Sequence, residues 1–212
     1  MKNIWITGAS SGIGKALAIK FANEGWQVAA SARREDLLNK ISESNKNISS
    51  FPLDVTDREK CKETFEQIKN KYQNIDICFF STGTWDPKKE KDIDIDQMKK
   101  VMDVNFFGTL NCIKAVENYF REKNSGHISI VSSIAGYRGL PNSTGYGASK
   151  AALNNLAESL YFDFGRYNVK VSLVSPGFIK TPMTDKNEFK MPFLKTAEFA
   201  ADKIYKLSLI QI

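Results

Sequence analysis

Residues 4–21 read IWITGASSGIGKALAIKF and decide the fold. The apolar run from Ile4 to Thr7 is typical of a buried strand, glycines follow at positions 8, 12 and 14, and a helical pattern of apolar residues comes next. Glycines allow a tight turn and a close approach of ligand, and the first N–H groups of a helix favour a pyrophosphate. The spacing G-x-x-x-G-x-G is not the most widely used dinucleotide fingerprint, so an ordinary turn is the alternative at this point.

The rest of the chain repeats this alternation of strand and helix. Such alternation predicts an α/β fold with a doubly wound, Rossmann-like parallel sheet, the strand order 3-2-1-4-5-6, right-handed crossovers and helices on both faces. The predicted strands after the first are residues 27–31, 48–53, 75–80, 128–131 and 169–174. The predicted helices that follow the first one are residues 35–44, 57–72, 95–123 with a bend near Gly108, 144–164 and 196–209.

Composition excludes several classes of protein. The chain has 212 residues and 42% hydrophobic content, enough for one core, so we expect a single domain over residues 1–212. The formal net charge is +6, but the basic residues are spread over the helical segments apart from short runs at Arg33–Arg34 and Lys88–Lys91, which argues against nucleic acid as a partner. Three widely spaced cysteines and a single histidine, His127, argue against a disulfide framework, a metal site and a Ser-His-Asp triad. No apolar run reaches the length of a membrane span and no signal-peptide core is visible, so we expect a cytoplasmic protein without membrane contact.

Arg33 and Arg34 follow the second predicted strand, where nucleotide-binding folds of this kind meet the adenosine ribose. An acidic residue at this place would bind the 2′-hydroxyl of NAD, but Ala32 and the two arginines occupy it. A guanidinium offers a charge-assisted fork of donors that suits a 2′-phosphate. We therefore expect NADP(H) to be preferred, with NAD(H) possible; the alternative is that the arginines only cap a loop.

Further turns are predicted at the same edge of the sheet. Asp54 and Val55 close the third strand, with Asp54 placed to meet an adenine amino group. The small residues 81–83, Ser-Thr-Gly, follow the fourth strand and would let a ribose or a flat ring pass close to the backbone. The loop after the sixth strand can wall a ligand, and residues 183–195 are interpreted as a substrate lid. The loop 84–92 is charged, carries a proline and is expected to be exposed.

Tyr146 and Lys150 stand one helical turn apart on an otherwise apolar stripe of the predicted helix 144–164. A lysine taken out of water needs a partner or a function, because burying an unpaired charge is costly. Ser133 ends the preceding strand, and a loop rich in glycine separates it from Tyr146. Alone, Tyr-x-x-x-Lys favours the plainer interpretation, a lysine that reaches the surface and an ordinary tyrosine at a helix start.

The ordered set of motifs resembles the short-chain dehydrogenases/reductases, in their short single-domain form with a Tyr-x-x-x-Lys active site. The resemblance covers almost the whole chain, and Ser133 precedes Tyr146 by 13 positions, the usual interval of the family. The matching pieces are Thr7-Gly8-x-x-x-Gly12-Ile-Gly14, Asp54-Val55, Asn105, Ser133, Tyr146-x-x-x-Lys150 and Pro176-Gly177 with Thr181. The resemblance implies a catalytic set of Asn105, Ser133, Tyr146 and Lys150, and no metal is expected at the site. It implies that the cofactor contacts Gly8, Ser10, Ser11, Gly12, Ile13, Gly14, Arg33, Arg34, Asp54, Val55, Ser81, Thr82, Gly83, Tyr146, Lys150, Pro176, Gly177, Ile179 and Thr181.

The resemblance also implies a division of labour among the four catalytic residues. Tyr146 would give its proton to a carbonyl oxygen as hydride reaches the carbon, while Ser133 donates a hydrogen bond to the same oxygen. The ammonium of Lys150 would favour the phenolate and hold the nicotinamide ribose. Asn105, flanked by apolar residues inside the predicted helix 95–123, would keep a water that relays protons.

Two departures from the family pattern stand out. Ser81-Thr82 replaces the usual Asn-Ala before Gly83, and the chain stops soon after its last helix, so that Leu209–Ile212 is at most a vestige of a seventh strand, which is short or absent. We expect an NADPH-dependent, reversible reductase of a small, hydrophobic carbonyl or alcohol substrate, assembled as a homodimer or homotetramer through the helices 95–123 and 144–164. The alternative is an NADP(H)-binding redox sensor or scaffold without turnover. The expected apolar wall of the substrate pocket consists of Ala135, Tyr137, Leu140, Phe178, Met183 and Phe193.

Overall fold

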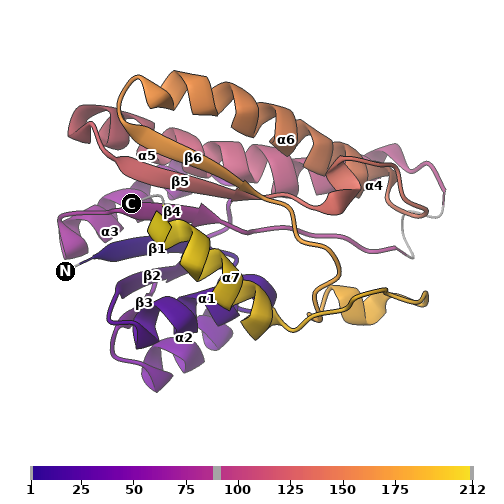
Figure 1. Ribbon diagram of the computed structural model, residues 1–212, viewed down its shortest axis with the longest axis horizontal. Coiled ribbons are helices and arrows are strands. Elements are labelled where there is room, and N and C mark those ends of the chain that lie inside the picture. Colours follow the sequence, from indigo (N-terminus) through magenta and orange to yellow (C-terminus); the bar gives the residue numbers. More distant parts are fainter. Residues whose placement is uncertain (1, 88–91, 211–212) are drawn as a thin grey trace.

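The computed structural model describes residues 2–87 and 92–210, which form one parallel sheet of six strands (Figure 1). Neighbouring strands follow the order β3-β2-β1-β4-β5-β6, as predicted. The strands are β1 Asn3–Thr7, β2 Gln27–Ser31, β3 Ile48–Ser50, β4 Ile77–Phe80, β5 Gly126–Val131 and β6 Val169–Val174. The bounds of β2 and β6 match the prediction, whereas β3 stops at Ser50 instead of residue 53 and β4 begins at Ile77 instead of residue 75.

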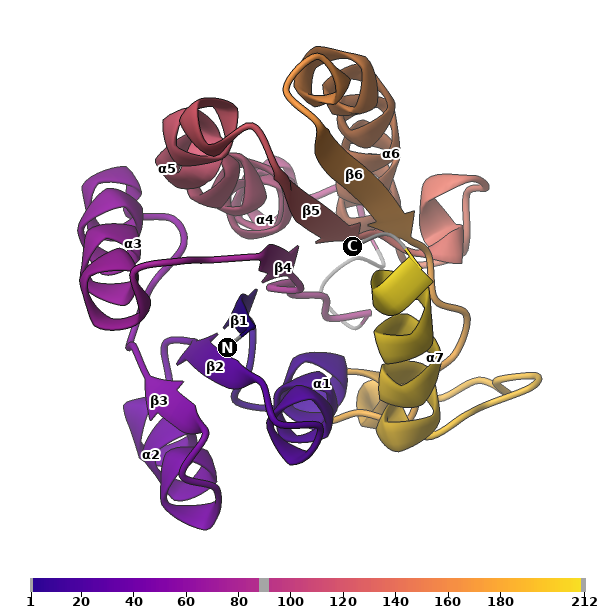
Figure 2. The ribbon, with the colours of Figure 1, turned by 60° about the vertical axis from the view of Figure 1, so that its left-hand side comes forward.

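Helices cover both faces of the sheet (Figure 2). The first face carries α1 Gly12–Asn23, α2 Glu35–Ser44 and α7 Ala197–Ile210. The second face carries α3 Arg58–Tyr72, α5 Gly108–Lys123 and α6 Thr144–Gly165, and α4 Ile95–Met102 packs against α6. Each set of helices shares its own apolar core with the sheet, which is the doubly wound arrangement.

The central strand β1 shows why both faces must be covered. Ile4 and Ile6 pack into the core of the first face, while Trp5 between them packs into the core of the second. All five residues of β1 are buried, as expected of a parallel strand between two layers of helices. The indole Nε1 of Trp5 donates a hydrogen bond to Ser31 Oγ at 2.9 Å, so its polar group is satisfied inside the core.

The predicted helix 95–123 is interrupted by a π-helical turn. α4 ends at Met102, the π turn spans Asp103–Phe107, and α5 begins at Gly108. The irregularity therefore lies just before Gly108, and the π turn contains Asn105, which is fully buried. A Cβ atom at Gly108 would lie 2.5 Å from Val55 Cγ2, so the absence of a side chain there lets α5 approach the turn after β3.

The loop 84–92, predicted to be exposed, is exposed at Asp92 but not over residues 84–87. Thr84–Asp86 are half-buried and Pro87 is buried, because this segment packs across other loops instead of projecting into solvent; residues 88–91, with their lysines, lie outside the described residues. The expectation that a seventh strand is short or absent is confirmed for the described residues: the sheet has six strands, and Leu209 belongs to α7, in which the Ser208 hydroxyl donates to the Ile204 carbonyl. Residues 211–212 lie outside the described part of the chain.

The register of the sheet brings the carboxyl ends of the central strands to one edge. Thr7 is aligned with Ser31 of β2 and with Phe80 of β4, and Phe80 is aligned with Ile130 of β5. The turns after these strands therefore meet where the strand order reverses between β1 and β4, which is where open α/β sheets bind ligands. None of the described helices combines the length and the apolar character that crossing a membrane requires.

Candidate active site

A cleft of about 550 Å³ opens at this carboxyl edge of the sheet, and all residues predicted to contact the cofactor line it. Ser133 lines it too, whereas Asn105 stands behind its wall. No motif pointed to Leu53, Val104 or Ser132, which also line the cleft. Such apolar or small residues are common at the ends of strands and helices, so they carried no chemical signal.

The glycine turn has the left-handed geometry that its composition predicts. Gly8 has φ of 70° and Gly12 has φ of 56°, a region that residues with a Cβ atom rarely adopt. At Gly14 a Cβ atom would collide with the carbonyl oxygen of Gly8 and would lie 2.8 Å from Ser81 Oγ. The turn is therefore tight enough to place the N-terminus of α1 on the cleft wall, where its N–H groups can hold a phosphate.

Two arginines and two serines gather at one end of the cleft. Arg34 Nη2 donates to Ser10 Oγ at 2.9 Å and to Ser11 Oγ at 2.7 Å. Arg33 forms a long ion pair with Asp54, 3.9 Å from Nη1 to Oδ2, and both side chains are largely exposed. Such a pair contributes little free energy, so it restrains the Arg33 side chain only weakly. The cluster offers a phosphate several donors at once. The contact of Asp54 with adenine stays a prediction.

The turn after β4 is stiffened despite its departure from the family pattern. Ser81 Oγ donates to the carbonyl oxygen of Thr7 at 2.6 Å and so fastens β4 to β1 at the point where the strand order reverses. Thr82 Oγ1 is buried and has no hydrogen-bond partner within the described residues, although Thr82 lines the cleft. A buried hydroxyl of this kind can be satisfied by a bound group.

Lys150 is only 3% exposed, so the interpretation in which it reaches the surface is wrong. Its Nζ donates to the carbonyl oxygen of Val131 at 2.9 Å and lies 5.7 Å from the centroid of the Tyr146 ring. Burial lowers the pKa of Lys150 from 10.5 to about 8, because the ammonium has lost its solvation. At neutral pH the charged form still dominates, so a cation stands beside the phenol.

Trp85 packs against Tyr146, and no sequence pattern pointed to it. The ring centroids are 5.3 Å apart and the ring planes differ by 30°. The indole Nε1 donates to the carbonyl oxygen of Asn142 at 3.0 Å. The tyrosine ring is therefore in contact both with an aromatic neighbour and with the lysine ammonium.

Ser133 stands at the end of β5 and lines the same cleft as Tyr146. Its Oγ accepts a hydrogen bond from the backbone N–H of Ala135 at 3.1 Å. Because that bond uses a lone pair of the hydroxyl, the hydroxyl proton can be donated to a substrate oxygen.

Asn105 connects two segments behind the cleft wall. Its Oδ1 accepts from the Thr84 N–H at 2.7 Å, and its Nδ2 donates to the Thr84 carbonyl at 3.1 Å and to Ser149 Oγ at 3.0 Å. Ser149 Oγ in turn donates to the carbonyl oxygen of Tyr146 at 2.7 Å. These bonds tie the loop after β4 to the first turns of α6, while the water-holding role of Asn105 stays a prediction.

The predicted apolar wall of the substrate pocket is only partly present. Met183 lines the cleft, but Phe193 is 91% exposed and Tyr137 is 61% exposed. Phe178 packs edge-on against Phe189, with ring centroids 5.9 Å apart. The prediction that all six side chains line the cleft is therefore wrong: only Met183 does, and Tyr137, Leu140 and Phe193 are exposed to solvent.

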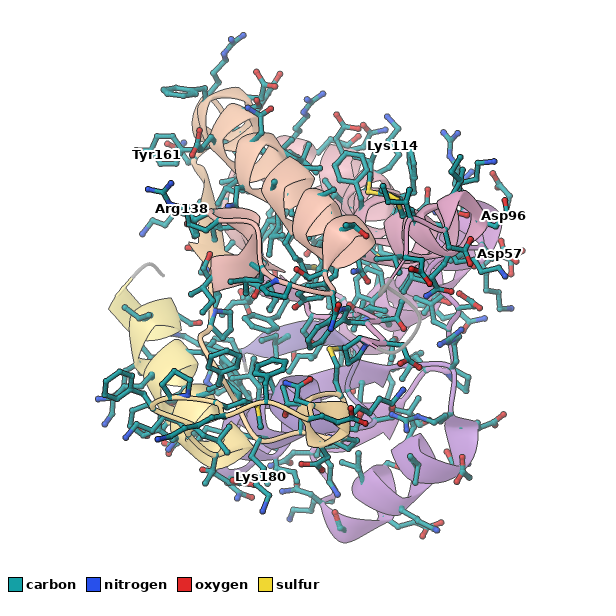
Figure 3. The ribbon with its side chains drawn as sticks, turned by 90° about the vertical axis from the view of Figure 1, so that its right-hand side faces the viewer. Asp57, Asp96, Lys114, Arg138, Tyr161 and Lys180 are labelled. Atoms are coloured by element: carbon teal, nitrogen blue, oxygen red, sulfur yellow. The ribbon has the colours of Figure 1, made fainter. Side chains whose placement is uncertain are left out.

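Residues 183–195, the predicted lid, are fastened at both ends. A 3-10 turn spans Thr184–Lys186, and the Thr184 hydroxyl donates to the Ile179 carbonyl at 2.7 Å. At the other end Lys195 forms a parallel bridge with Ile179. The side chain of Lys180, the residue after Ile179, points outward from the protein (Figure 3). The segment is a loop tied down beside the cleft, not a separate element.

A family model described as short chain dehydrogenase matches residues 2–191. The chain belongs to the short-chain dehydrogenase family. An uncharacterized oxidoreductase of Staphylococcus epidermidis is 34% identical over 185 residues, which cover 87% of this chain and 80% of that protein. The 3-oxoacyl-[acyl-carrier-protein] reductase FabG of Thermotoga maritima is 37% identical over 190 residues, which cover 85% and 75%. The solved structure of ElxO with NADP bound has a TM-score of 0.87 and 30% identity, and the match covers 97% of this chain and 90% of that one.

This short-chain dehydrogenase is accordingly an oxidoreductase that works with a nicotinamide cofactor, and the cleft fits such a group. The N-terminus of α1 and the glycine cradle suit a pyrophosphate. Arg34 and its two serine partners suit a further phosphate, and the buried Thr82 hydroxyl has a hydrogen bond to offer.

Proposed function

We propose that the protein is an NADPH-dependent reductase of a small, hydrophobic carbonyl compound, able to run in reverse as an alcohol dehydrogenase. The observation that carries the proposal is the arrangement around Tyr146. The buried ammonium of Lys150 lies beside its ring, and Ser133 lines the same cleft with a hydroxyl proton that can be donated. Together these groups can polarise a carbonyl by hydrogen bonding and give a proton to its oxygen.

The cofactor, when bound, supplies the hydride, and the protein supplies placement and protons. The hydroxyl groups of Ser133 and Tyr146 would hold the substrate oxygen, and the phenol proton would move to that oxygen as negative charge develops there. Lys150, anchored on the Val131 carbonyl, would stabilise the phenolate that is left behind. Behind the site, Asn105 keeps the loop after β4 and the start of α6 in place.

The preference for NADP(H) over NAD(H) is supported by charge at the adenosine end of the cleft. Ala32 and Arg33 line the cleft where an acidic residue would select NAD, and Arg34 already binds two hydroxyl groups of the glycine turn. ElxO, 30% identical to this chain, has NADP bound in its solved structure. A 2′-phosphate would meet guanidinium groups and hydroxyl donors here.

The remaining parts of the proposal concern substrate and assembly. Met183 and Pro182 line the cleft at the start of the segment 183–195, which supports this segment as a substrate lid and an apolar substrate. FabG of Thermotoga maritima, 37% identical to this chain, is a reductase of 3-oxoacyl groups, which are carbonyl compounds. We propose one cofactor-binding domain over residues 1–212. It assembles into a homodimer or homotetramer through the segment from α4 to α5 and through α6; a monomer on size-exclusion chromatography would contradict the assembly.

One experiment tests the activity. Purified protein is mixed with NADPH and a panel of ketones, aldehydes and quinones, and the loss of nicotinamide absorbance is followed for wild type, Tyr146→Phe and Tyr161→Phe. Tyr161 provides a matched control, because it lies on α6 as well but is 60% exposed and points into solvent (Figure 3). We expect turnover with wild type and Tyr161→Phe and a loss of about 10²-fold to 10⁴-fold with Tyr146→Phe. Binding of NADPH without consumption on the whole panel would instead support a redox sensor or scaffold.

A further inference from the structure

Three consecutive residues after β4 tie together separate parts of the active site. Thr84 is held on both its N–H and its carbonyl by the Asn105 amide. Trp85 binds the Asn142 carbonyl and packs on Tyr146. Asp86 forms an ion pair with Lys186 of the segment 183–195, with 3.5 Å between Oδ2 and Nζ. Residues 84–86 therefore join the π turn, the entry to α6 and the proposed lid.

Trp85 differs from the other two tryptophans of the chain. Trp5 and Trp26 belong to the two apolar cores, at 0% and 4% exposure, and Trp85 belongs to neither core. Its ring packs against Tyr146, and its N–H donates a hydrogen bond to the backbone of the loop that leads into α6. A large aromatic side chain is therefore placed beside the tyrosine of the site instead of contributing to the packing of the sheet.

The hydrogen bond to Asn142 gives the indole a fixed orientation. Asn142 has φ of 52°, a left-handed conformation that asparagine tolerates better than most residues. Its carbonyl oxygen accepts the hydrogen bond of Trp85, and in the same loop the Ser143 hydroxyl donates to the Leu140 carbonyl just before α6 begins. The indole is thus anchored at its nitrogen, and its ring restricts where the Tyr146 ring can go.

We propose that Trp85 is a positioning residue for the catalytic tyrosine. Its indole keeps the Tyr146 ring next to the Lys150 ammonium, so that the hydroxyl of Tyr146 and that of Ser133 reach the same substrate oxygen. This inference rests on the proposed function and adds to it a residue that acts through Tyr146. Because displacement of a catalytic group by about 1 Å can cost roughly 100-fold in rate, loss of the indole should lower kcat.

The kinetic test compares Trp85→Ala and Trp85→Phe with Tyr161→Ala, which removes an exposed aromatic ring from α6. We expect Trp85→Ala to lower kcat by about 10-fold to 100-fold while the Kd of NADPH stays within about twofold. Trp85→Phe keeps a ring against Tyr146 and should recover most of kcat, although it loses the bond to Asn142. An unchanged kcat in Trp85→Ala, or an equal loss in Trp85→Phe and Trp85→Ala, would overturn the proposal.

A second readout does not depend on turnover. The phenolate of Tyr146 absorbs in the near ultraviolet. Subtracting, for wild type and for Trp85→Ala, the spectrum of the same protein carrying Tyr146→Phe isolates its ionisation during an alkaline titration. If Trp85 holds the ring near Lys150, the two groups titrate as a coupled pair, because a proton on Lys150 favours the phenolate and the phenolate favours that proton. Trp85→Ala moves them apart and therefore moves the phenolate ionisation to higher pH. A shift to lower pH would show that the indole acts only by excluding water, and no shift would show that it does not position the ring; both results contradict the proposal.

The two readouts separate the failure of this inference from the failure of the proposed function. Absence of wild-type turnover on every carbonyl compound contradicts the reductase, yet the absorbance titration still decides whether Trp85 positions Tyr146. Wild-type turnover together with unchanged kcat and unchanged titration in Trp85→Ala keeps the reductase and rejects the positioning role. If Trp85→Ala does not fold, Trp85→Leu takes its place in both measurements, because it retains bulk without an aromatic face.

Discussion

Lys150 Nζ donates a hydrogen bond of 2.9 Å to the Val131 carbonyl oxygen while the lysine side chain is almost completely shielded from solvent. The backbone oxygen carries only a partial charge, so burial dominates and lowers the pKa of Lys150 from 10.5 to about 8. Between these two pH values the unfolded chain binds a proton that the folded protein does not. The contribution of Lys150 to the free energy of unfolding should therefore rise by roughly 3 kcal/mol as the pH increases from about 8 to about 10.5.

Lys150→Met removes this contribution. Below pH 8 the variant should be more stable than the wild type, because a buried ammonium costs stability there, and the difference should shrink towards pH 10.5. Urea unfolding at a series of pH values measures it, with exposed Lys62→Met on α3 as the control. Parallel curves for wild type and Lys150→Met would show that Lys150 is not the titrating group.

Arg34 and Arg33 should decide the choice of cofactor. Arg34→Ala removes a guanidinium that donates hydrogen bonds to Ser10 and Ser11. The loss of charge-assisted bonds to a 2′-phosphate should weaken NADPH binding by about 10-fold to 100-fold. Arg33→Ala should act in the same direction. Binding of NADH should change little in both, as measured by fluorescence titration against Arg166→Ala, an exposed arginine at the end of α6. Equal losses for NADPH and NADH would sink the assignment of these arginines to a 2′-phosphate.

The parts of the site that could be predicted from the sequence are those whose chemistry is local. The glycine turn requires backbone geometry that only a few residues adopt, and Gly8 and Gly12 do have positive φ. Tyr146 and Lys150 are separated by one helical turn, so a helix alone brings them together. The alternation of strand and helix was enough to predict a parallel sheet with helices on both faces, and the resemblance to a Rossmann-like family added the order of the strands.

The parts that could not be predicted depend on contacts between distant segments. Trp85 meets a backbone oxygen 57 positions away, and nothing in its charged neighbourhood signals this. The π turn contains the buried Asn105 and is followed at once by Gly108, which closely approaches Val55, more than 50 positions earlier in the chain. Aromatic residues in the loops, such as Phe193, were assigned to the pocket by composition, but the fold of those loops leaves them in solvent.

Gly108→Ala should destabilise the protein. The new methyl group would lie 2.5 Å from Val55 Cγ2, so α5 or the turn after β3 must shift, at a cost of about 1–3 kcal/mol. Because Val55 lines the cleft, NADPH binding should weaken as well. Gly165→Ala is the matched control at the end of α6, where a Cβ atom would meet nothing within 4 Å, and its stability should change little. If thermal unfolding shows the same effect for both variants, the close approach of α5 to Val55 is not what the glycine serves.

His127 should make the protein sensitive to acid. It is 2% exposed, its Nε2 is 2.8 Å from Ser172 Oγ, and its Nδ1 is buried without a partner among the described residues, so an added proton on that nitrogen would find no acceptor there. Burial, aided by the charge of Lys170, lowers the pKa of His127 from 6.5 to about 4. Between these values the unfolded chain is protonated and the folded protein is not, so stability present above pH 6.5 is lost as the pH falls, by roughly 3 kcal/mol at pH 4. His127 is the only histidine in the chain, and carboxylate titration affects wild type and His127→Gln alike. Between pH 6.5 and pH 4 the wild-type curve of unfolding free energy should therefore fall by roughly 3 kcal/mol more than the His127→Gln curve. A constant separation between the two curves would mean that the imidazole can be protonated in the folded state at little cost.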